Sequence, residues 1–446
     1  MRLDNFNGGN GSADIAFDAL AFVPGTYNGL KLTGNMTVNP TAPDPAPVEP
    51  EEDITDSLFS AAGSSSANTA TAAPMAMAAT STASCSTVNH SLSRKRTTAC
   101  IHSDYAMTEY SNTVPVGSAA FDLYITYYLD PKSADLSQVT TIRLKSMDGT
   151  VNSATFDYAA KCRGYCDVTS VDWNGSKTFA KGDTLLRTVT TRFKWTPSGT
   201  TNTINPYLSL GGRVNSTSVV NPSEFESAKL DIRCDTEVAN AGTGCVFAGY
   251  KPTYVMNSKK FPGAAAHIDM MWRKTNIKWG QRSSGKPLTY LGNKMSVDGS
   301  GKIQSDRNRQ LICARQWKTY SGTGLFSDMW SLDAGEPRTD ARSCDEFAFA
   351  NSFQSAGNSA GPNPVNYSGA ECIQTYVRRN ADDTMTLHLR PNTTPPTWKE
   401  PCGRSSMSNW QNTQSMRPFG DFIKEQRLME DDGYWVDLDG FTAPTP

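Results

Sequence analysis

The chain has 446 residues, which exceeds the size of one ordinary hydrophobic core and predicts two or three domains. Its 42 Lys and Arg residues nearly balance its 44 Asp and Glu residues, and 38% of the residues are hydrophobic. No run approaches the roughly 18 to 20 apolar residues of a membrane-spanning helix, so the composition favours a soluble protein.

The ten cysteines predict disulfide bonds in an oxidising compartment, because their number is even and no zinc-site spacing of Cys or His is present. We therefore expect a secreted, extracellular protein, although the start "MRLDNFNGGNGS" shows no signal peptide. This contradiction indicates a fragment, a misassigned start or an unusual export route. The expected bonds join consecutive cysteines: Cys85–Cys100, Cys162–Cys166, Cys234–Cys245, Cys313–Cys344 and Cys372–Cys402.

The first two segments differ in composition. Residues 1–36 contain alternating apolar positions such as Ile15 and Phe17, which is typical of the closing strands of a truncated β-domain. Residues 37–84 are rich in Pro, Ala, Ser and Thr and cannot bury enough apolar surface to offset chain entropy. We interpret them as a linker.

Residues 85–230 show the period-two pattern of β-strands and predict an all-β, sandwich-like domain. Turn signals such as "MDGT" and "WNGS" separate the runs. His102 is interpreted as a surface or packing residue and "KCRGYC" as a tight disulfide loop. The residues expected on one strand face are Phe121, Leu123, Ile125, Tyr127 and Leu129 in one run, and Val189, Thr191, Phe193 and Trp195 in another.

The remainder, residues 231–446, has a mixed pattern and predicts an α+β domain. A helix is expected in "SMRPFGDFIKEQRLMEDDG", where Phe419, Phe422, Ile423 and Gln426 or Arg427 follow helical spacing and Gly433 closes the helix. The following "YWVDLDGF" is interpreted as a strand.

Basic residues concentrate in residues 251–318, which hold fourteen Lys or Arg residues against three Asp residues, an excess of eleven positive charges. Such a run is often only a solvated face. Because Trp272, Trp279 and Trp317 lie within it, it also suits a surface that neutralises phosphates and stacks planar groups.

Four blocks in residues 231–446 together resemble the NucA/NucB deoxyribonucleases, particularly secreted actinomycete forms with an upstream β-rich region. "CDEFAFANSFQSAG" is similar to the acidic core motif of that family. "RCDTEVANAGTGCVFAGYKPTYVMN" resembles its Cys-framed entry, "FPGAAAHIDMMW" and "DRNRQLIC" its His-Ile and Arg-rich segments, and "GDFIKEQRLMEDDGYWV" its closing segment.

The resemblance implies a ββα-metal core, a divalent cation such as Mg²⁺ or Mn²⁺, and metal-assisted cleavage of DNA. It implies that Asp345 or Glu346 activates water, and we assign Asp345 as general base and Glu346 as the metal-linked acid, with the reverse left open. An Asp is ionised at neutral pH without tuning. Because neighbouring strand residues face opposite sides, the two acids reach one metal only where the strand ends or bulges.

Further site residues follow from the same resemblance. Asn412, or its neighbour Asn409, matches a neutral metal ligand, and His267 matches a residue that contacts phosphate or the leaving group, unless it is a packed helix histidine. Gln354 stands where the family often has Glu and is expected as a weaker ligand. The expected substrate-binding cations are Arg307, Arg309, Lys274 and Lys278.

The sequence therefore predicts a secreted, nonspecific, metal-dependent endodeoxyribonuclease, a hydrolase with DNA as its partner. The alternative is a catalytically inactive extracellular protein with a degenerate nuclease domain that binds DNA or the cell envelope. An envelope or polysaccharide ligand of the β-domain, and an immunity protein if the chain is a toxin, are further expected partners.

Overall fold

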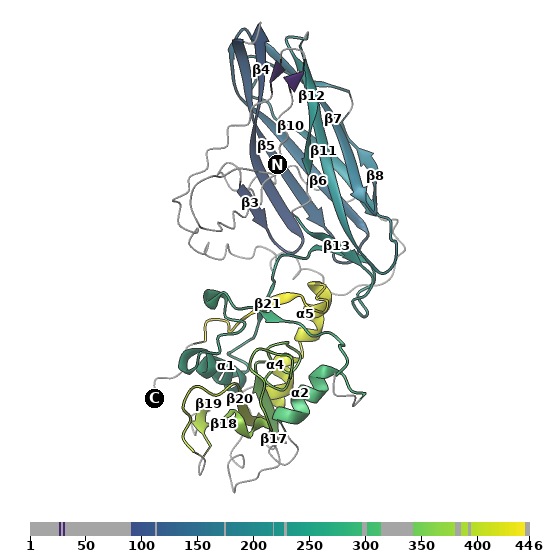
Figure 1. The fold of residues 1–446 in the computed structure, drawn as a ribbon. Coiled ribbons are helices and arrows are strands. Elements are labelled where there is room, and N and C mark those ends of the chain that lie inside the picture. The colour runs from purple at the N-terminus through teal and green to yellow at the C-terminus, as the bar shows by residue number, and fades with distance from the viewer. Residues whose placement is uncertain are drawn as a thin grey trace, which may run out of the picture.

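The protein is mostly β, with two large sheets in its amino-terminal part and two small sheets with helices in its carboxy-terminal part (Figure 1). The predicted linker at 37–84, together with Cys85 and Trp317, lies outside the described residues. The computed structural model describes residues 26–27, 30–31, 91–111, 114–173, 175–216, 218–226, 230–296, 301–313, 342–379, 385–390 and 394–441.

The first large sheet is antiparallel, with strand order β1-β2-β4-β5-β6-β10-β8 and β3 paired with β4. The predicted alternation is confirmed on β5 and β10, where the residues listed from the pattern are buried. The short β1 and β2 are the described part of the predicted segment 1–36, and they extend this sheet. The strands are β1 (Thr26–Tyr27), β2 (Leu30–Lys31), β3 (Ser91–Arg94), β4 (Thr98–Ser111), β5 (Val114–Leu129), β6 (Asp135–Gly149), β8 (Cys166–Val171) and β10 (Arg187–Trp195).

The second large sheet has the order β14-β13-β11-β7-β9, with β12 paired with β11, and shares one core with the first. Phe121 of β5 contacts Phe156 of β7 at a ring-centroid distance of 4.8 Å and Phe179 of β9 at 5.3 Å. Strands β13 and β14 lie beyond residue 230 and still belong to this sheet. The strands are β7 (Ser153–Gly164), β9 (Lys177–Ala180), β11 (Thr201–Val214), β12 (Ser218–Glu226), β13 (Ile232–Asp235) and β14 (Gly244–Phe247).

The carboxy-terminal part contains a three-stranded sheet, β15-β21-β16, and a four-stranded sheet, β17-β20-β18-β19. Helix α1 packs against the four-stranded sheet, and a second core joins them. No described helix is long and apolar enough to cross a membrane. The elements are β15 (Thr253–Val255), α1 (Pro262–Lys274), η2 (Arg282–Ser284), β16 (Leu288–Thr289), α2 (Gln304–Ile312), β17 (Arg342–Phe347), η3 (Gly369–Glu371), β18 (Ile373–Arg379), β19 (Met385–Leu389), β20 (Gly403–Ser408), α4 (Asn409–Met416), α5 (Phe419–Glu425) and β21 (Gly433–Asp437).

The predicted final helix is confirmed over Phe419–Glu425 and wrong beyond it, because the chain leaves the helix well before Gly433. The backbone of Arg427 has a φ of 46°, a left-handed conformation that ends a helix. Gly433 instead begins β21, and the strand predicted after the helix is confirmed.

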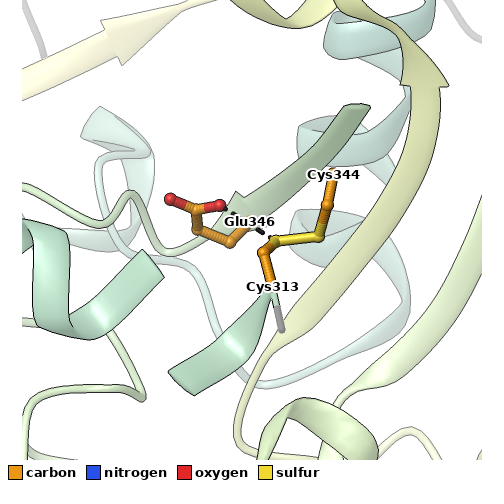
Figure 2. A group of neighbouring side chains, drawn as sticks. All are labelled: Cys313, Cys344 and Glu346. Atoms are coloured by element: carbon orange, nitrogen blue, oxygen red, sulfur yellow. Dashed lines mark hydrogen bonds between the residues drawn. A yellow bond between two sulfur atoms is a disulfide. The ribbon is translucent and has the colours of Figure 1, made fainter. Parts of the chain in front are cut away.

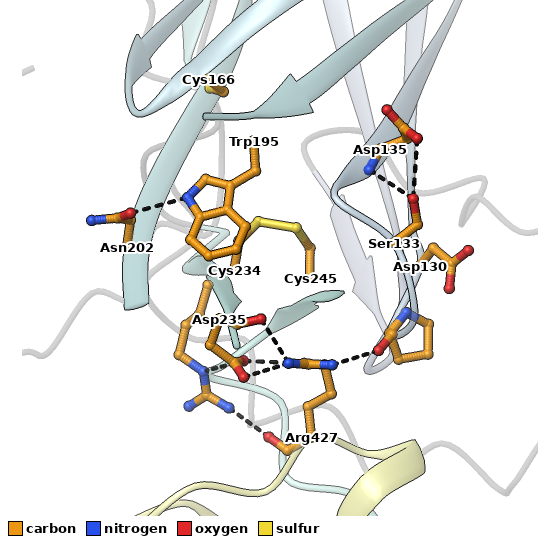
Figure 3. The surroundings of a disulfide bond; sticks show 12 residues. Asp130, Ser133, Asp135, Cys166, Trp195, Asn202, Cys234, Asp235, Cys245 and Arg427 are labelled. Carbon is orange, nitrogen blue, oxygen red and sulfur yellow. Dashed lines mark hydrogen bonds and ion pairs between the residues drawn. A yellow bond between two sulfur atoms is a disulfide. The ribbon is translucent and has the colours of Figure 1, made fainter. Parts of the chain in front are cut away.

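Four of the five predicted disulfides are confirmed: Cys162–Cys166, Cys234–Cys245, Cys313–Cys344 and Cys372–Cys402. The Cys313–Cys344 bond joins the end of α2 to β17 (Figure 2), and Cys234–Cys245 joins β13 to β14 (Figure 3). The fifth predicted bond involves Cys85, which is not among the described residues. No described cysteine is free.

Arg427 anchors the carboxy-terminal part to the sandwich and is fully buried (Figure 3). Its guanidinium donates to both carboxylate oxygens of Asp235 on β13, at 2.5 and 3.1 Å, and to the Asp235 carbonyl at 2.7 Å. It also donates to the carbonyls of Pro131 and Gly242, at 2.7 and 2.9 Å. The charge is thus paired and hydrogen-bonded, as a buried arginine requires.

A second set of ion pairs lies beside this contact. Arg96 and Arg233 of the sandwich donate to the carboxylate of Asp432, at 2.8 Å each. Burial alone would raise the pKa of Asp432, but hydrogen bonds from Arg233 and the charge of Arg96 outweigh it and hold that pKa below its ordinary value. We call Arg96, Arg233, Asp235, Arg427 and Asp432 the interdomain clamp.

Candidate active site

Strand β17 carries the two acids of the predicted motif on opposite faces. It pairs antiparallel with β20, so that Asp345 stands opposite Ser405 and Glu346 opposite Arg404. Asp345 contacts α1, whereas Glu346 contacts α2, as the alternation of strand side chains requires. Helix α4 follows β20 directly, which gives the spatial order strand, strand, helix.

Asp345 is hydrogen-bonded to His267 of α1. Its Oδ2 lies 3.0 Å from Nδ1 of His267, whose side chain is 0% exposed, while the Asp345 side chain is 10% exposed. The second ring nitrogen of His267, Nε2, is buried and has no hydrogen-bond partner among the described residues. The Asp345 side chain therefore keeps a small exposed fraction, whereas the imidazole has none.

Glu346 lies against the Cys313–Cys344 disulfide (Figure 2), with Oε2 3.2 Å from Sγ of Cys313. A disulfide sulfur carries no hydrogen, so this contact does not satisfy the carboxylate. Burial raises the pKa of Glu346 to about 7, opposed by the nearby charge of Arg309, whose Nε lies 3.7 Å from Oε1. The group is poised between its charged and neutral forms near neutral pH.

Helix α2 is fastened beside Glu346 at three points. The disulfide holds its end, Nδ2 of the buried Asn308 donates to the carbonyl of Ala350 at 2.7 Å, and Nη1 of Arg404 donates to the carbonyl of Ile312 at 3.0 Å. Arg309 of this helix, predicted as a phosphate contact, is thereby placed near Glu346.

Asn412 lies on α4, whose first turn is capped by the Ser408 side chain accepting from the N–H of Gln411. Nδ2 of Asn412 donates to Oγ of Ser343 at 2.7 Å and to the carbonyl of Cys344 at 2.9 Å. These bonds fix the helix on β17 and use the amide nitrogen. The alternative, Asn409, is exposed at the start of α4.

Gln354, the third predicted ligand, makes its contacts at β16. Gln354 accepts from the N–H of Thr289 at 2.8 Å and donates to its hydroxyl at 3.1 Å, so both ends of its amide hold β16. Lys274 and Lys278 are exposed at and beyond the end of α1, and Arg307 is half-buried on α2. None of these contacts involves Asp345 or Glu346.

Among the described residues, one group of three potential metal ligands from His, Cys, Asp and Glu lies close together: Cys313, Cys344 and Glu346. Its two cysteines are joined to each other, so they offer no thiolate ligands. The structure thus presents single carboxylates and an asparagine oxygen rather than a complete protein cage.

The sequence did not single out Ser405, which stands opposite Asp345, Gly403, which lies beside His267, or the interdomain clamp. The run of small residues in "CGRSSMS" is the signal that was available for the first two, because small residues let neighbouring groups approach closely.

The fold and site define a β-rich, disulfide-linked protein whose smaller part carries a buried His–Asp pair beside a second acid. A scan against protein-family models found no match, and searches of curated proteins and of solved structures found none either. The family resemblance remains a prediction.

Proposed function

We propose that the chain is a secreted deoxyribonuclease that hydrolyses phosphodiester bonds with a divalent cation. The observation that carries this proposal is Asp345 on β17, with a side chain 10% exposed and hydrogen-bonded by the buried His267, within a strand–strand–helix arrangement. The motif resemblance in residues 231–446 supplies the reaction class, and the geometry supports it.

Asp345 is the general base of the proposed reaction. In this role its carboxylate accepts a proton from an attacking water. Because Oδ2 takes the hydrogen bond with His267, the remaining oxygen, Oδ1, is the one that receives the proton.

By the resemblance Glu346 and Asn412 would hold the cation, but no described contact joins them, because Asn412 bonds Ser343 on the Asp345 face of β17 whereas Glu346 faces α2. Mg²⁺ usually takes one or two carboxylates, keeps several waters and completes its shell with substrate phosphates, so a full protein cage is not required. The buried Glu346 carboxylate, with its raised pKa, gains from a positive charge. When bound, the ion neutralises charge on the phosphoryl group.

Positive charge beside Glu346 and at the end of α1 suits a polyanionic substrate. Arg309 is half-exposed and reaches toward Glu346, while Lys274 and Lys278 are exposed at and beyond the end of α1. Contacts of this kind favour phosphate backbones without reading base sequence and weaken as salt concentration rises.

The four disulfides suit the extracellular space, because such bonds persist in oxidising surroundings. In this proposal the sandwich positions the nuclease part through the interdomain clamp.

Plasmid nicking tests the proposal. Purified protein with Mg²⁺ or Mn²⁺ should nick supercoiled DNA, EDTA should stop it, and Asp345→Ala and Glu346→Ala should each lower the rate by about 10²- to 10⁴-fold. The matched control is Asp421→Ala, an exposed acid on α5, which should keep the wild-type rate. Absence of nicking with any divalent ion would refute the proposal, and salt-dependent DNA binding without cleavage would favour the non-catalytic alternative.

A further inference from the structure

We infer that His267 is a positioning residue for Asp345 and does not contact the substrate, an inference that rests on the proposed function. The resemblance alone left two roles for this histidine, contact with phosphate or packing within a helix. Its geometry supports a third role, which is to hold the carboxylate of the general base in one orientation.

The hydrogen bond fixes which ring nitrogen carries the proton. An ionised carboxylate only accepts hydrogen bonds, so Nδ1 of His267 donates to Oδ2 of Asp345 across 3.0 Å. A bond to a charged acceptor is stronger than one between neutral groups. No other described side chain donates to this carboxylate, so His267 determines its rotation and leaves Oδ1 for water.

The imidazole is closed off from any substrate. Its exposed fraction is 0%, and its Nε2 faces the backbone of β20 at Gly403. A Cβ added to Gly403 would lie 2.8 Å from Nε2 of His267 and 2.5 Å from Sδ of Met271, one turn further along α1. Only a residue without a side chain at position 403 leaves room for the His267 ring, so Gly403 helps to hold the ring against Asp345.

No other described side chain around Asp345 holds its carboxylate in this structure. Ser405 stands opposite on β20, and its buried hydroxyl makes no hydrogen bond with any described residue. Glu346, the next residue, faces α2 and is itself an acid. The amide nitrogen of Asn412 already donates to Ser343 and to the carbonyl of Cys344. Loss of the imidazole therefore frees the carboxylate to rotate.

Three variants test the inference in the full-length protein. His267→Leu removes the donor at similar volume, His267→Asn returns an N–H close to the position of Nδ1, and Met271→Leu is the packing control on the same buried helix face. We expect His267→Leu to lower kcat by about 10- to 100-fold, the effect of misplacing a reacting group by about 1 Å, with little change in KM. His267→Asn should recover most of that loss, and Met271→Leu should keep the wild-type kcat.

Gly403→Ala provides an independent approach, because it moves the ring without changing the donor. It should lower kcat in the same way as His267→Leu while leaving Asp345 and His267 chemically intact. A wild-type kcat in either folded variant would overturn the inference.

Nitrogen-15 NMR of the imidazole separates failure of this inference from failure of the proposed function. In the wild-type protein the ring of His267 should show a protonated Nδ1 and an unprotonated Nε2 at neutral pH, whether or not the protein cleaves DNA. The opposite tautomer would overturn the positioning role even in an active enzyme. A protein with the expected tautomer and no cleavage would refute the nuclease proposal alone. Because the spectrum is recorded on the wild-type protein, it also tests the inference in the case that His267→Leu does not fold.

Discussion

Removal of the Arg427 side chain should destabilise the protein strongly. The guanidinium makes five hydrogen bonds to the sandwich, and both it and Asp235 are fully buried. Arg427→Ala leaves the buried Asp235 carboxylate without its hydrogen-bonded partner and with only Arg233, whose Nε lies 3.7 Å away, and breaking a buried pair typically costs about 3 to 5 kcal/mol of unfolding free energy. Urea unfolding followed by tryptophan fluorescence measures this loss, and limited proteolysis shows whether the carboxy-terminal part is released.

Two comparisons make this prediction specific. Lys424→Ala removes an exposed partner of Asp421 at 3.3 Å on α5, and such surface pairs contribute at most about 1 kcal/mol. The double variant Arg427→Met with Asp235→Leu removes both charges and should be more stable than Arg427→Met alone, because no buried charge is left unpaired. A loss below about 1 kcal/mol in Arg427→Ala, or a double variant less stable than the single one, would refute the reasoning.

Two further predictions concern the candidate site. Burial raises the pKa of Glu346 from 4.5 to about 7, so the folded state binds more protons than the unfolded state between these values, and stability falls as pH rises through that window. In EDTA, the unfolding free energy of Glu346→Gln should therefore exceed that of the wild type by up to about 3 kcal/mol above pH 7 and by nothing below about pH 4.5. The exposed Glu425→Gln should follow the wild type. Equal stability of Glu346→Gln and wild type in denaturant titrations across pH would contradict this. Gln354→Ala should cost about 1 to 3 kcal/mol because Thr289 loses both of its amide contacts, while Mn²⁺ affinity measured by calorimetry stays unchanged; a fall in affinity would instead support a ligand role for Gln354.

The strands of the sandwich could be predicted because their signal is local. Alternation on β5 and β10 follows from one face of each strand packing into the core, and consecutive cysteines bond where the chain turns back on itself. The opposite facing of Asp345 and Glu346 also follows from strand geometry alone.

Contacts between distant segments could not be predicted in this way. His267 and Asp345 are 78 residues apart, and Arg427 and Asp235 are 192 apart, so no periodic pattern connects them. The predicted end of α5 was wrong for the same reason. The sequence continues with helix-forming residues, but Arg427 turns out of the helix toward a carboxylate that only the folded sandwich provides.

The interdomain clamp has a consequence for how such a chain can be recombined during evolution or engineering. Strands β13 and β14 follow the expected domain boundary in sequence, yet they complete a sandwich sheet and hold the Asp235 that Arg427 needs. A cut at residue 230 would keep Asp235 with Arg427 but remove two strands from the sandwich sheet, whereas a cut after β14 would leave Arg427 without its carboxylate. Any transfer of the acid-bearing part to a new carrier must therefore take the β13–β14 hairpin with it or replace Arg427 with an apolar residue.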